Sequence, residues 1–192
     1  MVAAAAYRSG LSLDDELTQE THDYTRRQGI ENTFIAAPEY APEWAHDWGR
    51  LWNAAEAAEV KKNARTAREV ELALPASVSA REREQIVRKV AGFLVERYGV
   101  AVACALHTPS RHGDHRNFHA HILMTTRRME AGGLGKKTRE LDDPKTGRQE
   151  ITNIRVFTAA AIEVLAGSGS SERVDPRSHK EPQGTGNRAA TH

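Results

Sequence analysis

Hydrophobic residues follow two regular patterns in the middle of the chain. Over 68–75 every second residue is aliphatic or small and its neighbours are mostly charged, which predicts a half-buried strand. Over 79–98 aliphatic and aromatic residues recur every three or four positions, which predicts an amphipathic helix. Ser79 and Glu82 form an S-x-x-E capping pattern at its start, and Gly99 follows its end.

Two further strands are predicted beyond this helix. Residues 100–108 form a continuous apolar run, which is typical of a buried strand, and residues 118–127 form a second strand. The segment 109–117 between them is polar. We therefore expect the two strands to pair as a hairpin.

Three more helices are predicted. The alanine-rich segment 2–9 forms a short helix that Gly10 ends. A long helix over 42–63 carries tryptophans at helical spacing, which we expect to pack in the core rather than stack on bases. Its apolar positions are Trp44, Trp48, Leu51, Trp52 and Ala55. Residues 152–166 form the last helix.

The remaining segments are predicted to be irregular. Residues 12–29 are polar and suggest a loop with a helical turn, and the residues between Pro38 and Pro42 are extended. Residues 129–150 are rich in glycine and charge and suggest a mobile basic loop. From 167 to 192 almost nothing is available to bury, so we expect a disordered polar tail after one domain over 1–166.

Composition places the chain among ordinary globular domains. It has 192 residues and a mass of 21.2 kDa, with 39% hydrophobic and 28% charged residues. No apolar run is long enough to span a bilayer, and no convincing signal peptide begins the chain, so we expect no membrane insertion. Cys104 is the only cysteine, which excludes an intrachain disulfide and a thiolate metal cage. A reducing cytoplasm fits best.

The net charge of +1 conceals an asymmetry. Residues 1–60 hold 4 basic and 11 acidic residues, whereas residues 61–192 hold 23 basic and 15 acidic residues. A basic body favours a polyanion such as DNA. The alternative is an ordinary solvated surface of mixed charge.

Three histidines are predicted to share one face of the hairpin. His119 and His121 are two residues apart on a strand, so both point to the same side, and His107 ends the partner strand. Three neutral imidazoles suit a divalent transition ion and leave positions open for substrate, which favours catalysis. Glu69 or Glu71, on the neighbouring strand, could orient one imidazole, unless both simply face solvent.

Two known patterns contain H-x-H on a strand. The cupin pattern fits Gly113, His119 and His121, but it requires a glutamate at 125 or 126, and both are threonine. The other pattern is the HUH motif of nucleic-acid endonucleases, in which an apolar residue separates the histidines and a tyrosine elsewhere is the nucleophile.

The wider sequence resembles the MobA/MobL family of plasmid relaxases, most closely the TraA type. The matching segments lie in order over about 1–178: A-A-A-A-Y-R-S-G at 3–10, H-D-Y-T-R-R-Q-G at 22–29, A-P-E-W at 41–44, R-L-W-N-A-A-E at 50–56, A-R-E-V-E-L-A-L-P at 67–75, G-D-H-R-N-F-H-A-H-I-L at 113–123, T-T-R at 125–127 and R-V-D-P-R-S at 173–178. The resemblance implies an α/β (α+β) fold with helices packed on a central antiparallel sheet, forming a nuclease domain over 1–166.

The resemblance also implies an activity. Such relaxases nick one DNA strand at a plasmid transfer origin, and a tyrosine becomes linked to the 5′ phosphate in a metal-dependent transesterification. Tyr24 matches the nucleophile, and it lies in a polar, arginine-flanked segment. Tyr7, Tyr40 and Tyr98 are competing candidates, of which we expect Tyr7 and Tyr98 to pack in the core. The implied metal ligands are His107, His119 and His121, for Mn²⁺ or Mg²⁺, with Zn²⁺ as an alternative.

The implied partners follow from this activity. They are single-stranded DNA at a transfer origin, accessory relaxosome proteins and a type IV secretion coupling protein, in a bacterial cytoplasm. Arg26 and Arg27 could hold phosphates beside the nucleophile. Lys136, Lys137 and Arg139, in the predicted basic loop, are candidates for gripping DNA.

The chain departs from the family pattern at three points. Family members usually carry a β-strand before the alanine-rich helix, so we expect that first strand to be missing. Pro176 stands where a histidine is common, and we expect the helicase region of TraA-type proteins to be missing. These departures leave one alternative, an inactive relaxase remnant that only binds DNA. The H-x-H pattern leaves a second, a cupin-like metal enzyme acting on a small molecule.

Overall fold

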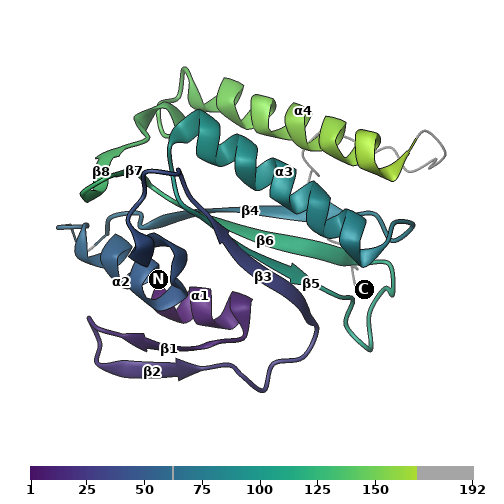
Figure 1. The fold of residues 1–192 in the computed structure, drawn as a ribbon, viewed down its shortest axis with the longest axis horizontal. Helices are drawn as coiled ribbons and strands as arrows, with labels where there is room; N and C mark the ends of the chain where they lie inside the picture. The colour runs from purple at the N-terminus through teal and green to yellow at the C-terminus, as the bar shows by residue number, and fades with distance from the viewer. Residues whose placement is uncertain (62, 168–192) are drawn as a thin grey trace, which may run out of the picture.

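A four-stranded antiparallel sheet forms the centre of the computed structural model, which describes residues 1–61 and 63–167. Its strands lie in the order β3-β5-β6-β4 (Figure 1). Their bounds are Ile30–Ala36 for β3, Val102–His107 for β5, Phe118–Thr125 for β6 and Ala67–Leu74 for β4. The predicted strands at 68–75, 100–108 and 118–127 are confirmed to within two residues, and β5 and β6 pair as the expected hairpin.

Two long helices cover one face of this sheet. α3 (Ala80–Tyr98) and α4 (Gly147–Ala166) run side by side over the strands in Figure 1. Alternate residues of β5 and β6 enter the core that these helices close, because side chains on a strand point to opposite faces in turn. The buried sheet residues on this side include Val102, Cys104, Leu106, Ala120, Ile122 and Met124.

A second group of elements covers the other face. It comprises α1 (Val2–Ser9), α2 (Trp48–Ala57) and a small hairpin of β1 (Ser12–Asp15) and β2 (Glu20–Asp23), which lie together in Figure 1. Ala101, Ala103 and Leu123 project from the sheet into this second core. Trp52 is fully buried there, which confirms that the tryptophan stripe belongs to the core.

Local signals define the ends of α1 and α3. The Ser79 hydroxyl accepts a hydrogen bond from the Glu82 backbone, and the Glu82 carboxylate accepts one from the Ser79 backbone, so the predicted capping box is present. Gly10 ends α1 with a φ of 67°, and a Cβ at this position would lie 2.2 Å from the Ile30 side chain. Glycine therefore suits the sharp turn of α1 against β3 better than a residue with a side chain.

Three expectations about the first third of the chain are wrong. Residues 12–29 contain the β1–β2 hairpin rather than a loop with a helical turn. The segment between Pro38 and Pro42 is a turn rather than extended, because the Ala41 backbone donates a hydrogen bond to the Pro38 carbonyl. The helix over 42–63 is instead a 3₁₀ turn, Glu43–His46, followed by the shorter α2. The break lies at Asp47, whose side chain accepts a hydrogen bond from the backbone of Arg50 and so caps a new helix.

The predicted mobile loop at 129–150 is also wrong. The segment forms β7 (Arg127–Glu130) and β8 (Gly133–Lys137), a 3₁₀ turn at Arg139–Leu141, and the first turn of α4, which begins at 147 rather than 152. Ion pairs hold it in place, because Arg127 and Lys137 both contact Glu59 and Arg128 contacts Glu140. The charges that suggested mobility are therefore used within the fold.

Most of the predicted tail, 168–192, lies outside the described residues, and so does Pro176. None of the described helices has the length and hydropathy needed to cross a membrane. The expected loss of a first strand stays a prediction.

Candidate metal centre

The three predicted histidines lie together on one face of the β5–β6 hairpin. His107 at the end of β5 is directly opposite His119 on β6, and His121 follows two residues along the same face. Their ring centroids are 4.9–5.2 Å apart. One nitrogen from each ring lies within 4.8 Å of the other two. The arrangement could therefore hold one metal ion.

Each imidazole also contacts an oxygen acceptor through one of its nitrogens. His107 Nε2 is 2.7 Å from the Arg8 carbonyl, His119 Nδ1 is 3.1 Å from the Asn117 carbonyl, and His121 Nδ1 is 2.5 Å from Oε1 of Glu69. Because these oxygens accept hydrogen bonds, the ring nitrogens facing them carry the protons. One unprotonated nitrogen per ring is then free for a metal, which is the usual arrangement of histidine ligands. The donor set fits a divalent ion.

The electrostatics keep two of the rings, those of His107 and His121, neutral. Burial lowers the pKa of His107 to about 4, and burial is also the largest cause of the lowered pKa of His121. The hydrogen bond from Arg8 is the main cause that holds the pKa of Glu69 below its usual value. At neutral pH the site therefore combines the neutral imidazoles of His107 and His121 with a carboxylate that accepts from His121.

Of the two glutamates predicted to orient a ligand, Glu69 makes the contact. Glu71 is opposite His121 in the register of β4 and β6, but its side chain is exposed and forms no hydrogen bond with a histidine among the described residues. Glu69 also binds the guanidinium of Arg8 through both carboxylate oxygens. This second contact depends on where α1 lies, which the strand pattern does not reveal.

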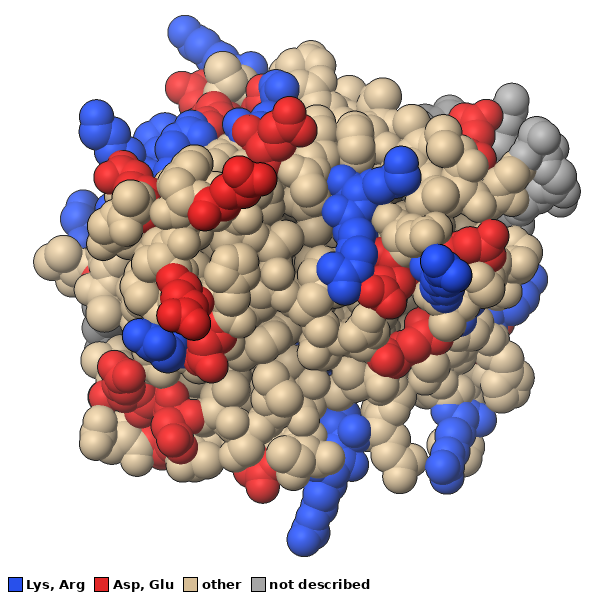
Figure 2. All heavy atoms as spheres, viewed as in Figure 1, with Lys and Arg blue, Asp and Glu red and all other residues tan. Residues whose placement is uncertain are grey.

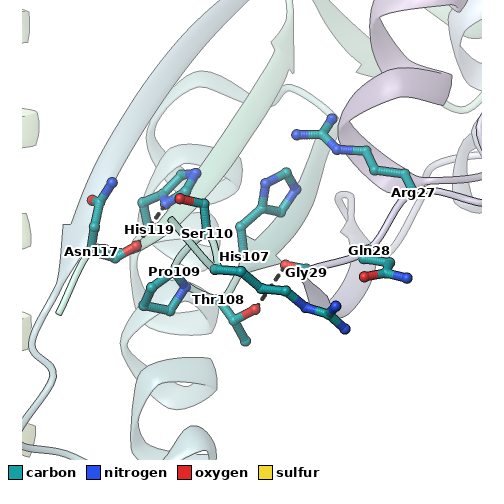
Figure 3. A pocket seen from close by; sticks show the side chains of 10 residues that line it. Arg27, Gln28, Gly29, His107, Thr108, Pro109, Ser110, Asn117 and His119 are labelled. Atoms are coloured by element: carbon teal, nitrogen blue, oxygen red, sulfur yellow. Dashed lines mark hydrogen bonds between the residues drawn. The ribbon is translucent and has the colours of Figure 1, made fainter. Parts of the chain in front are cut away.

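A cavity of about 550 Å³ opens beside the histidines. Figure 3 shows His107 and His119 at its wall, with Arg27 reaching towards them from the segment before β3. Its lining residues are Arg27, Gln28, Gly29, His107, Thr108, Pro109, Ser110, Arg111, Asn117 and His119. Two are arginines and none of these ten is acidic. The cavity is therefore suited to an anionic group close to the metal position.

Two tyrosines lie close to this cavity. The rings of Tyr7 and Tyr24 meet edge to face, with centroids 5.2 Å apart. Tyr24 is half-buried and packs against the second core, whereas Tyr7 is 42% exposed. The guanidinium of Arg27 lies 3.7 Å from the Tyr7 ring centroid, and that of Arg8 lies 5.5 Å away.

The expectation that Tyr7 packs in the core is therefore wrong. The buried positions of α1 are Val2, Ala5, Ala6 and Ser9, which occupy one side of the helix. Tyr7 lies outside that stripe. The helical spacing already contained this signal, although the run of alanines obscures it.

The predicted DNA-binding residues do not gather at one place. Arg27 lines the cavity and Arg26 is exposed beside it in sequence. Thr138, which follows β8, hydrogen-bonds to Thr126 beyond the far end of β6. Lys136, Lys137 and Arg139 therefore lie beside the end of the sheet opposite His119, roughly 20 Å away along the strand. Figure 2 shows acidic and basic side chains interspersed on the face seen in Figure 1.

Comparison with known proteins gives the class of this molecule. The MobA/MobL family matches residues 1–192, so the chain belongs to this family of mobilisation relaxases. It is 34% identical to "Mobilization protein MobL" of Acidithiobacillus ferridurans, an alignment that covers 92% of this chain and 53% of that protein. It is 31% identical to "Probable mobilization protein MobA" of Bifidobacterium longum, over 78% of this chain and 28% of that protein.

Two further similarities concern larger relatives and the fold. "Conjugal transfer protein TraA" of Rhizobium radiobacter is 28% identical over 71% of this chain and 13% of that protein. The chain thus spans about half, or less, of the length of these curated relatives. A solved structure reported as "Molecular Basis of Vancomycin Resistance Transfer in Staphylococcus aureus" has the same fold, with a TM-score of 0.75, 23% identity, and coverage of 93% of this chain and 91% of that one.

The fold also decides against the cupin-like alternative. A cupin is a double-sheet jelly roll of β-strands. Here one antiparallel sheet carries helices on both faces, as expected for the α/β relaxase-like class. Thr125 and Thr126, where the cupin pattern requires a glutamate, lie six and seven residues beyond His119 and bond to backbone carbonyls.

Proposed function

We propose that this protein nicks one strand of DNA at a plasmid transfer origin by a metal-dependent tyrosine transesterification. The observation that carries the proposal is the histidine triad. An oxygen acceptor orients each ring, and the cavity beside the triad is lined by ten residues of which none is acidic. Membership of the MobA/MobL family supports the same activity. The nuclease domain would occupy residues 1–166.

His107, His119 and His121 would hold the ion, either Mn²⁺ or Mg²⁺, with Zn²⁺ as the alternative that imidazoles favour. When bound, a divalent ion supplies Lewis-acid stabilisation of the non-bridging phosphate oxygens. The protein's part is to fix the three ligands and to keep acidic side chains out of the cavity. Arg27 and Arg111 would hold phosphates of the strand that enters it.

The nucleophile is one phenol of the Tyr7–Tyr24 pair. The phenol loses its proton and its oxygen attacks the phosphorus, while the bond to the 3′ oxygen breaks and that oxygen takes up a proton. A 5′-phosphotyrosine and a free 3′ hydroxyl result, and the same steps in reverse reseal the strand. Tyr24 is the residue predicted from the sequence, but exposure and the two guanidinium contacts favour Tyr7.

The wider system follows from the relatives, whose names refer to mobilisation and conjugal transfer. We propose that the substrate is single-stranded DNA in a bacterial cytoplasm. Accessory relaxosome proteins and a type IV secretion coupling protein would be its partners. Arg26 would bind DNA phosphates next to Arg27. Lys136 and Arg139 would contact only those parts of the DNA strand that extend beyond the cavity.

The test is formation of a covalent adduct. Labelled single-stranded oligonucleotides that tile the transfer origin are incubated with protein and Mn²⁺, and denaturing gels then detect DNA linked to protein. We expect an adduct from the wild type, and none after EDTA treatment or with His119→Ala. If folded, Mn²⁺-loaded protein binds the oligonucleotides but yields no adduct, the activity is overturned and an inactive DNA-binding remnant is supported.

A further inference from the structure

Arg8 contacts the metal centre from two directions. Its backbone carbonyl lies 2.7 Å from Nε2 of His107. Its guanidinium binds Glu69 in a fork, with Nε 2.9 Å from Oε1 and Nη2 3.2 Å from Oε2. Glu69 Oε1 in turn lies 2.5 Å from Nδ1 of His121. One residue is therefore connected to two of the three histidines.

The position of Arg8 on α1 explains both contacts. The last carbonyls of a helix have no partner within the helix and accept from other donors. The Arg8 carbonyl belongs to this final turn, just before the sharp turn at Gly10, and His107 supplies the donor. The side chain of Arg8 reaches across the sheet to β4, because Glu69 stands on the same face as the histidines.

The same turn of α1 carries Tyr7, directly before Arg8 in the sequence. The Arg8 guanidinium lies 5.5 Å from the Tyr7 ring centroid while it also holds Glu69. Any shift of α1 along the sheet would thus move three groups together: the Tyr7 phenol, the Arg8 carbonyl that faces His107, and the Arg8 guanidinium that binds Glu69. The end of α1 and the metal centre form one connected unit.

We propose that Arg8 is a positioning residue, which holds His121 through Glu69 and places α1, with its exposed tyrosine, against the metal ligands. The inference rests on the proposed metal centre. A carboxylate that accepts from a ligand histidine needs a fixed orientation itself. The planar guanidinium provides it, because two parallel hydrogen bonds define the plane of the Glu69 carboxylate. Lysine would keep the charge but lose this fork.

The test compares Arg8→Ala and Arg8→Lys with a matched control, Arg97→Ala. Arg97 binds Glu150 with the same forked geometry, at 2.6 and 2.8 Å, between α3 and α4 on the opposite side of the sheet. Mn²⁺ binding is measured by titration calorimetry. We expect Arg8→Ala to weaken Mn²⁺ binding about 10- to 100-fold, Arg8→Lys to restore part of it, and Arg97→Ala to leave it unchanged.

A second readout needs no metal. Nitrogen-15 spectra of the histidine rings report which ring nitrogen carries the proton, and we expect His121 to be protonated at Nδ1 in the wild type and in Arg97→Ala. In Arg8→Ala we expect a mixture of tautomers. Unchanged Mn²⁺ affinity and an unchanged His121 tautomer in Arg8→Ala would overturn the positioning role of Arg8 but leave the proposed metal centre standing. A wild type that binds no Mn²⁺ would overturn the metal centre and this inference with it.

Discussion

Tyr7 and Tyr24 meet edge to face with ring centroids 5.2 Å apart, although they are 17 positions apart in the sequence. The two side chains differ in what surrounds them. Tyr7 is 42% exposed and lies beneath the Arg27 guanidinium, whereas Tyr24 packs against the second core. This difference in surroundings, which no short motif around either tyrosine reveals, is the basis on which we propose Tyr7 rather than Tyr24 as the nucleophile.

We expect Tyr7→Phe to abolish the covalent adduct and Tyr24→Phe to lower its rate only a few-fold, since the ring of Tyr24 would still support Tyr7. Loss of one phenolic oxygen leaves both packing surfaces in place, so both variants fold. Adduct formation on denaturing gels checks this prediction. The reverse result, with adduct from Tyr7→Phe and none from Tyr24→Phe, would make Tyr24 the nucleophile.

Glu69→Gln is expected to weaken Mn²⁺ binding by about 10- to 100-fold, because the amide replaces the carboxylate that accepts from His121 and pairs with Arg8. Glu71→Gln is the matched control, because Glu71 lies two residues along β4 on the same face of the sheet. This variant should bind Mn²⁺ as the wild type does. Calorimetric titration distinguishes them. Equal affinities in the two variants would show that Glu69 does not support the metal centre.

Binding of single-stranded DNA should depend on the cavity arginines more than on the distant lysine. Each phosphate contact that Arg111→Ala removes should reduce the slope of log affinity against log salt by roughly 0.7. Lys136→Ala, at the other end of the sheet, should change the slope less. Fluorescence anisotropy over a range of salt concentrations measures both slopes. A larger effect of Lys136→Ala would place the main DNA contact at β8.

Lys137→Ala should act on stability instead. Lys137 Nζ is 2.6 Å from Oε2 of Glu59, whose side chain is only 8% exposed. Removing the lysine leaves this carboxylate with Arg127 as its remaining ion-pair partner. We expect a loss of roughly 1–3 kcal/mol in the free energy of unfolding, measured by urea denaturation. Unchanged stability with weaker DNA binding would restore the role predicted from the sequence.

Acidification should remove the contribution of Glu150 to stability. Its hydrogen bonds with Arg97 and then Tyr98 lower the pKa of Glu150 to about 2, below the value of about 4.5 for an unperturbed glutamate. The contribution is therefore present above pH 4.5 and is lost as the pH falls towards 2. Glu150→Gln should be destabilised by up to about 1 kcal/mol at pH 7, and this difference should shrink below pH 4.5. Urea denaturation at several pH values tests the sign.

The sequence by itself determined the elements whose signals are local. The period-2 pattern of β4, the capping box of α3 and the apolar run of β5 each act over a few residues, so their physical causes are contained in the segment. His119 and His121 are two residues apart on one strand, so their side chains share a face of the sheet. The hairpin brings His107 to the same face. The three histidines that could hold a metal ion were thus predictable from the sequence.

Tertiary structure decided everything that depends on distant partners. The charges at 129–150 suggested a mobile loop, but Glu59 and other carboxylates elsewhere in the fold pair with them and order the segment. The choice between Glu69 and Glu71 was open because both stand on the histidine face, and the position of Arg8 on α1 decides it. Likewise, the exposure of Tyr7 follows from the side on which α1 packs. A sequence specifies which face a side chain takes on its own element, whereas packing between elements determines what that side chain meets.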